Sequence, residues 1–92
     1  MKEQFRQFLI NKGYKVVTPS GNPSTVYDYL KRIDKVCEWE LIDNWTNLAK
    51  NITEIRLQYE SSGEKSELGA RSHNAVICAL RQFEEFVIQN TI

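Results

Sequence analysis

The chain has 92 residues, with 12 Lys and Arg against 12 Asp and Glu, so its formal net charge is zero. This length suits a single domain, residues 1–92, whose core is too small to surround a deep substrate cleft as well. Because the total charge is balanced, an anionic partner has to be recognised by a local cluster of cations.

The composition argues against a metal site, a disulfide framework and a membrane span. The chain has two cysteines and one histidine, with no Cys-x-x-Cys pair, which excludes the usual four-ligand zinc sites and argues against a disulfide framework. No apolar run is long enough for a secretory leader or a membrane span. We therefore expect a protein of the reducing cytosol without a cofactor.

The first predicted helix covers residues 2–12. Phe5, Phe8 and Leu9 follow the spacing of one helical face. Gly13 is well suited to end the helix, because glycine readily adopts the left-handed conformation found after helix C-termini.

A loop over residues 14–21 precedes a second predicted helix, residues 23–40. Asn22 is expected to cap it and Pro23 to occupy its first position, where a missing N–H has no cost. Its inward stripe is Val26, Leu30, Ile33 and Cys37.

Apolar residues at intervals of three and four continue over residues 45–60. They fit one helix, or a short turn followed by a main helix from Ile52. The run Asn51-Ile52-Thr53-Glu54 matches a capping box, in which Glu54 would reach back to the Asn51 N–H. The members of this face are Trp45, Leu48, Ile52, Ile55 and Tyr59.

Residues 61–69 are predicted to form a polar loop, and Ser72 to cap a last helix over residues 73–89. Cys78 falls off the apolar stripe of this helix and is expected to be partly exposed. The stripe consists of Val76, Ala79, Leu80, Phe83, Phe86 and Val87. No segment alternates long enough to predict a sheet, so the expected fold class is all-α.

Two polar helix faces carry the candidate binding residues. Lys31 and Lys35 lie opposite the inward stripe of the second helix, with Thr25 and Arg32 at the edge of their side. A row of cations with a hydroxyl group at the helix N-terminus can bind phosphates. The same pattern also fits an ordinary solvated face.

The last helix carries a weaker version of this pattern. Arg71, Asn74 and Arg81 project away from its apolar stripe, and His73 lies near its first turn. A single histidine without a nucleophile or an acid–base set does not predict catalysis, so we expect no enzymatic activity.

Three segments resemble the core-binding domain of phage integrases, the tyrosine recombinases. Residues 22–33, NPSTVYDYLKRI, resemble its opening, commonly Ser-Pro-x-Thr-Ile/Val-x-x-Tyr-x-x-x-Leu. The resemblance to the third and last helices of the family rests on Trp45, Leu48, Ile52 and Tyr59, and on Ser72, Val76, Leu80, Phe83 and Phe86. The likeness extends over most of the chain from Asn22 onward.

The resemblance implies a four-helix, SAM-like orthogonal bundle that clamps one side of duplex DNA, while a separate domain carries the chemistry. The contacts that it implies are Thr25, Lys31, Arg32, Lys35, Arg71, His73, Asn74 and Arg81. The sequence departs from the family in four ways. It lacks the Arg, His-x-x-Arg and Tyr catalytic set and the usual basic surplus, it has Ala75 where Thr is frequent, and its loop over residues 14–21 is longer.

Two functions follow as expectations, neither involving a membrane or a small-molecule substrate. The first is non-catalytic binding to the phosphate backbone of duplex DNA through the second and last helices. The alternative is a protein–protein interaction module, which the neutral charge, Glu84 and Glu85, and an aromatic anchor at Trp39 would favour. Trp39 can equally pack within the fold.

Overall fold

The computed structural model describes residues 1–17, 19–21 and 24–90. Within these ranges the chain is all-α, as expected, and contains no β-strand. Six helical segments replace the four that the sequence predicts. They are α1 (Lys2–Asn11), α2 (Thr25–Trp39), α3 (Trp45–Lys50), α4 (Ile52–Tyr59), α5 (Ser66–Gly69) and α6 (Arg71–Gln89).

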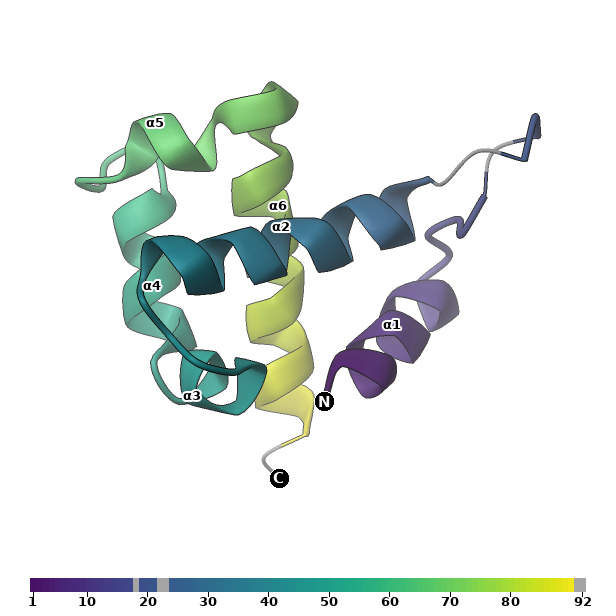
Figure 1. Ribbon diagram of the computed structural model, residues 1–92, viewed down its shortest axis with the longest axis horizontal. Helices are drawn as coiled ribbons and strands as arrows, with labels where there is room; N and C mark the ends of the chain where they lie inside the picture. Colours follow the sequence, from purple (N-terminus) through teal and green to yellow (C-terminus); the bar gives the residue numbers. More distant parts are fainter. Residues whose placement is uncertain (18, 22–23, 91–92) are drawn as a thin grey trace.

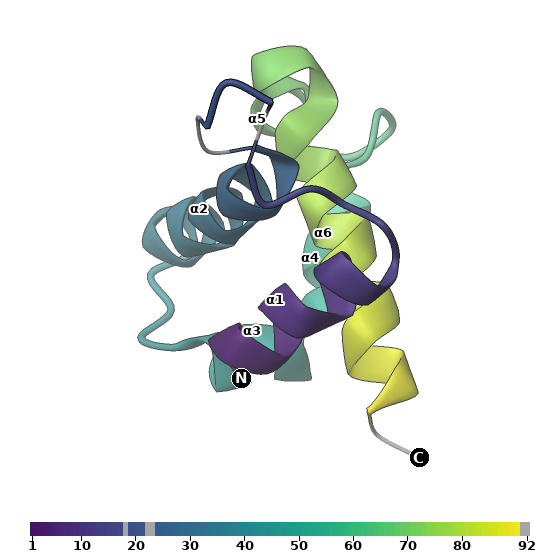
Figure 2. The same cartoon turned by 90° about the vertical axis from the view of Figure 1, so that its right-hand side faces the viewer.

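The longest helix, α6, is the centre of the fold, and the other five helices all contact it. α2 crosses α6 on one side, α4 runs along it, and α1 lies beside its C-terminal half (Figures 1 and 2). The short α5 packs at the opposite end, next to the first turn of α6 (Figure 1). This arrangement leaves one whole side of α2 facing solvent.

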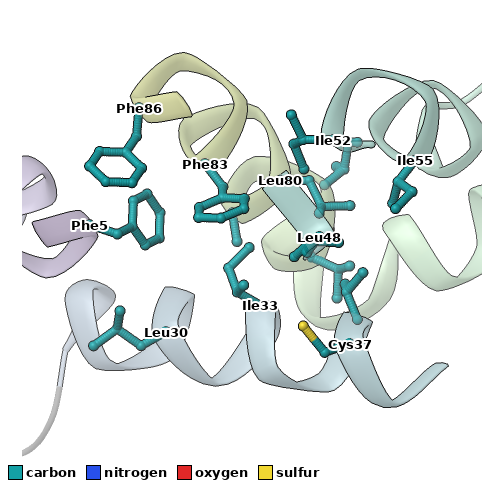
Figure 3. Packing of buried hydrophobic residues seen from close by; sticks show 14 of the residues in the cluster. Phe5, Leu30, Ile33, Cys37, Leu48, Ile52, Ile55, Leu80, Phe83 and Phe86 are labelled. Atoms are coloured by element: carbon teal, nitrogen blue, oxygen red, sulfur yellow. The ribbon is translucent and has the colours of Figure 1, made fainter. Parts of the chain in front are cut away.

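The core consists of the apolar stripes that the helical spacing predicts. The stripes of α2 and α6 face each other, and Phe5 of α1 packs against both Phe83 and Phe86 of α6 (Figure 3). The ring centroid of Phe5 lies 5.2 Å from that of Phe83 and 5.5 Å from that of Phe86. Cys37 is buried in this core and Cys78 is half-buried, as predicted. Neither cysteine forms a disulfide.

The start of α2 differs from the prediction. Ser24, in an extended conformation, precedes the first residue Thr25, and its side chain makes no capping hydrogen bond. The Ser24 N–H donates instead to the Val16 carbonyl at 3.0 Å, and the Val26 N–H to the Lys15 carbonyl at 3.1 Å. The loop before α2 thus satisfies donors that a cap would otherwise satisfy. The predicted cap and first residue at positions 22 and 23 lie outside the described residues.

The helical region predicted over residues 45–60 is divided into two helices, and the predicted capping box is wrong. α3 ends at Lys50 and α4 begins at Ile52, which agrees with the broken form of the prediction. The Asn51 side chain turns back and donates to the Asn47 carbonyl at 3.4 Å, so it does not cap α4. The cap belongs to Asn44, whose Oδ1 accepts from the Asn47 N–H at 2.8 Å.

The polar segment over residues 61–69 is not entirely a loop, because its end forms the single turn α5. Gly69 in this turn is buried against α4. A Cβ atom at Gly69 would lie 2.0 Å from the Tyr59 carbonyl oxygen, so no other residue permits this approach. A prediction based on the polar composition of the segment could not detect this contact.

Ser72 does not cap the last helix either. Ser72, His73 and Asn74 have φ values of 54°, 58° and 68°, and form a left-handed turn inside the start of α6. The Asn74 N–H donates across this turn to the Ala70 carbonyl at 3.0 Å. The turn therefore joins α5 directly to α6, and regular helix follows it.

Two helices end with the same hydrogen-bond pattern, but with different residues at its centre. After α1, the Tyr14 N–H bonds the Leu9 carbonyl across Gly13, which has φ +99°. After α2, the Ile42 N–H bonds the Cys37 carbonyl at 2.9 Å. The residue crossed there is Leu41, with φ 57° and a side chain that is 91% exposed. Both ends are Schellman motifs, whose central position favours glycine.

The end of α2 generates a prediction for stability. Leu41→Gly should leave the free energy of unfolding unchanged or raise it by up to about 1 kcal/mol, because it removes the left-handed strain and loses no burial. The reciprocal change, Gly13→Ala, should cost about 1 kcal/mol, since open space surrounds Gly13 and only its conformation matters. Urea unfolding of both variants measures this difference. A large loss of stability in Leu41→Gly would contradict it.

Candidate nucleic-acid interface

The solvent-facing side of α2 carries cations with different degrees of neutralisation. Lys31 is exposed, and within the described residues it has no carboxylate partner. Lys35 has a loose ion pair with Glu38, at 3.7 Å between Nζ and Oε2. Arg32 is more firmly held, with its Nη2 3.1 Å from Asp28. Lys31 and Lys35 are therefore the two α2 cations most available to an outside anion.

Arg71 lies at the C-terminal end of α2. Its guanidinium sits over the Trp39 ring, 5.5 Å from the ring centroid. Trp39 is four residues after Lys35, so both project from the same side of α2. Arg71 is exposed and, in the part of the chain that the structure describes, it has no ion pair. The stack on Trp39 thus places a cation where the row formed by Lys31 and Lys35 ends.

Lys15, which is not among the predicted contacts, lies at the other end of α2. Its carbonyl accepts from the Val26 N–H in the first turn of α2, so Lys15 lies beside the N-terminus of the helix. Lys15 is exposed, and no carboxylate pairs with it among residues 1–17, 19–21 and 24–90. Its position depends on a loop-to-helix hydrogen bond that no sequence spacing indicates.

Tyr27 is a second residue of this surface that is not among the predicted contacts. It is 42% exposed and lies one helical turn before Lys31, so its hydroxyl group can also reach a ligand on this side. The four-residue spacing between Tyr27 and Lys31 could have indicated from the sequence that both lie on one helix face. We use the name α2 ridge for Lys15, Tyr27, Lys31, Lys35 and Arg71.

The remaining predicted contacts differ in position. Thr25 is half-buried as the first residue of α2, at the same end as Lys15. His73 and Asn74 are exposed in the left-handed turn that follows Arg71. These three residues flank the two ends of the α2 ridge.

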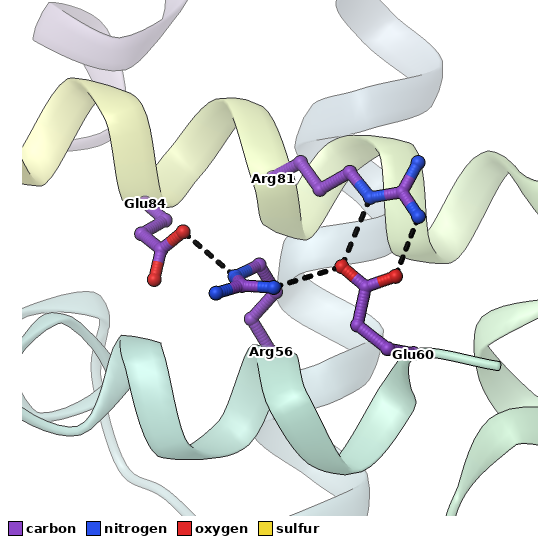
Figure 4. Close-up of polar contacts among 4 residues, drawn as sticks. All are labelled: Arg56, Glu60, Arg81 and Glu84. Atoms are coloured by element: carbon purple, nitrogen blue, oxygen red, sulfur yellow. Dashed lines mark hydrogen bonds and ion pairs between the residues drawn. The ribbon is translucent and has the colours of Figure 1, made fainter. Parts of the chain in front are cut away.

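Arg81, by contrast, is committed to another partner. Its Nη2 lies 2.5 Å and its Nε 3.0 Å from the two carboxylate oxygens of Glu60 (Figure 4). Glu60 also accepts from Arg56 at 2.9 Å, and Arg56 forms an ion pair with Glu84 at 2.7 Å. This four-residue network links α4 to α6, so the structure gives Arg81 a structural role.

Trp39 packs within the fold, as one reading of the sequence had it. Its ring stacks on Tyr59 of α4 with centroids 6.3 Å apart. The Tyr59 hydroxyl donates to Glu40 at 2.9 Å, and Lys65 donates to the same carboxylate at 2.5 Å. Burial, and then the hydrogen bond to Glu40, raise the pKa of Tyr59. The Trp39 ring is therefore in contact with both Tyr59 and Arg71 and is not an open aromatic anchor.

Several carboxylates limit the extent of the cationic surface. Glu64 and Glu67, in and before α5, are exposed, and within the described chain no cation pairs with them. They stand on either side of Lys65 in the sequence and precede Arg71, in the corner next to the C-terminal end of α2. An anionic ligand is therefore favoured along α2 and disfavoured over α5.

Comparison with protein-family models, curated proteins and solved structures found no match for this chain. Among the described residues, no three His, Cys, Asp or Glu side chains are close enough to hold a metal ion. No helix in the same residues has both the length and the apolar character needed to cross a bilayer.

The Arg56–Glu60–Arg81 network predicts a specific response to acid. Hydrogen bonds from Arg81 and then Arg56 lower the pKa of Glu60 from 4.5 to about 2. Because the folded-state pKa is the lower one, Glu60 stabilises the fold above pH 4.5, and this stabilisation is lost as the pH falls toward 2. Glu60→Gln should cost about 1.5–3 kcal/mol at pH 7.

Urea unfolding at pH 7, 4.5 and 2.5 tests this response. The difference between wild type and Glu60→Gln should shrink steadily over this series. Glu54→Gln is the control, because Glu54 is exposed in the first turn of α4 and has no ion pair in the described structure. A Glu60→Gln effect that stays constant with pH would show that the network does not depend on the carboxylate charge.

Proposed function

We propose that this chain is a non-catalytic helical module that binds the phosphate backbone of duplex DNA along the α2 ridge. The observation that carries the proposal is the placement of the unpaired cations. Lys15, Lys31 and Arg71 lie at the start, middle and end of α2, although the chain as a whole has no net charge. Of the four exposed cations without an ion pair in the described residues, only Lys50 lies elsewhere, at the end of α3, so the other three give α2 a local electrostatic footprint for an anion.

The dimensions of the ridge favour an extended anion over a small one. Lys31 and Lys35 are separated by four residues, or about 6 Å of helix rise, and the whole of α2 spans about 22 Å. Duplex DNA presents phosphates continuously over such a length. The carboxylates of Glu64 and Glu67 repel the backbone at the α5 corner, so the duplex is expected to contact α2 mainly from its N-terminal end to Arg71.

Binding of this kind carries little sequence information. Lysine ammonium groups act as point charges that favour phosphates, and hydroxyl groups such as those of Thr25 and Tyr27 add further phosphate contacts. The ridge contains no Asn or Gln for reading adenine, and its one arginine is stacked on Trp39. We therefore expect binding that depends on salt and not on base sequence.

The resemblance of residues 22–33 to the integrase core-binding domain supports the same proposal. In that comparison α1, α2, the pair α3 and α4, and α6 would correspond to the four helices of a SAM-like bundle, with α5 as an added turn. The candidate surface lies on α2 and at the start of α6, the two helices from which the resemblance implies DNA contacts. Arg81 is left out of the proposed contact set because Glu60 holds it.

A protein-interaction module built around Trp39 has less support. Trp39 is covered by Arg71 and Tyr59. The carboxylates that favoured this alternative are engaged internally, Glu84 with Arg56 and Glu85 with Lys12. Neither feature is therefore open to a partner.

The first test compares charge reversal on the α2 ridge with charge reversal at a position outside it. Lys31→Glu with Lys35→Glu should abolish binding to a labelled duplex at low salt, while circular dichroism shows unchanged helicity. Lys50→Glu is the matched control, because Lys50 is also exposed and unpaired in the described structure but lies at the end of α3. Fluorescence anisotropy across a salt series measures the effect. Wild-type protein that binds no duplex at low salt would refute the proposal.

A second test distinguishes Arg71 from Arg81, both of which the sequence predicts as DNA contacts. Arg71→Gln should weaken duplex binding and lower the magnitude of the salt slope by about 1, with little effect on stability. Arg81→Gln should leave binding unchanged and lower the free energy of unfolding by about 1.5–3 kcal/mol, because Glu60 loses a charged partner. Equal losses of affinity in the two variants would contradict the ridge as defined here.

A further inference from the structure

A hollow on the surface lies on the side formed by α1, α3 and the C-terminal end of α6. It is an open groove of about 510 Å³ with a mainly apolar lining, formed by Met1, Gln4, Thr46, Ala49, Lys50, Phe86, Val87 and Asn90. A smaller hollow of about 250 Å³ continues from it past the start of α4, sharing Ala49, Lys50 and Val87. Lys50 thus stands at the centre of the combined groove, and within the described residues no carboxylate neutralises it.

The loop between α2 and α3 presents the complementary shape. Leu41 is 91% exposed in a conformation that disfavours any side chain with a Cβ, so folding of the monomer gains nothing from a leucine at this position. Asp43 follows two residues later, is exposed, and has no cation partner in the described part of the chain. A protruding leucine and an unpaired carboxylate are what a groove with an apolar floor and a central lysine would accept.

The loop and the groove are connected through α3. The loop carrying Leu41 leads directly into α3, and α3 supplies Thr46, Ala49 and Lys50 to the groove. Figure 1 shows this loop running from the end of α2, close to α5, down to α3, which lies beside the C-terminal end of α6. A surface that carries both parts of a contact can pair with itself around a two-fold axis, with each copy supplying both parts.

We propose that the chain forms a two-fold dimer in which Leu41 of each copy enters the groove of the other and Asp43 pairs with the other copy's Lys50. This inference is independent of the proposed DNA binding, because the groove is formed by α1, α3 and α6 and not by the α2 ridge. The conformational cost of Leu41 is then offset by apolar burial in the dimer. The contact is specific because it combines a leucine side chain that fits an apolar groove with a pair of opposite charges.

The first experiment measures self-association of the full chain by sedimentation velocity over a wide range of concentrations. Wild type should shift from monomer to dimer and stop at dimer. Leu41→Gly should weaken the dimer at least about tenfold while the variant unfolds no more easily than wild type. Leu57→Ser is the control, since Leu57 is also exposed, at 53%, but lies on α4 outside the groove and the loop.

The second experiment tests the charge pair. Asp43→Lys and Lys50→Asp should each weaken the dimer, and the double variant should recover most of the lost association. A protein that is monomeric at every concentration overturns the inference. So does a dimer that is insensitive to Leu41→Gly, or a double variant that associates no better than the single ones.

Discussion

The fold depends on burying the apolar stripe of α6, which every other helix contacts. Phe83 and Phe86 hold α1 through Phe5, and the same stripe faces the inward side of α2. A 92-residue chain has room for one such core, so each helix has one committed face and one open face. This constraint decides which polar side chains remain available on α2, and therefore where a partner can bind.

The electrostatic character of the surface follows from pairing more than from composition. Arg81 and Lys31 looked equivalent in the sequence because both project from the polar side of a helix. In the fold Arg81 meets Glu60 from α4, whereas Lys31 faces solvent with no carboxylate beside it in the described residues. A chain with no net charge can therefore still have a cationic surface, because internal ion pairs hold carboxylates away from that surface.

Sequence spacing predicted the helix faces well and the helix ends poorly. All four residues of the predicted α2 stripe are buried, because the periodicity of a helix is a property of one segment, although Val36 beside them is buried as well. The end of α1 was predicted from Gly13, but the identical motif at Leu41 contains no glycine to signal it. Asn51, Ser72 and the turn α5 were misjudged because their hydrogen bonds and contacts depend on neighbours such as Asn47, Ala70 and Tyr59. The same reason explains why Lys15 was missed.

The contrast between Gly13 and Leu41 also bears on how the open faces are used. Both positions satisfy the same backbone geometry, so the geometry alone gives no reason to prefer leucine over glycine at Leu41. Packing within the monomer gives none either, because the side chain is almost fully exposed. A residue that is strained in its backbone and unburied in its side chain gains stabilisation only from a contact outside the monomer. The α2 ridge and the Leu41 loop would then be separate consequences of one small core, which leaves two surfaces open for two different partners.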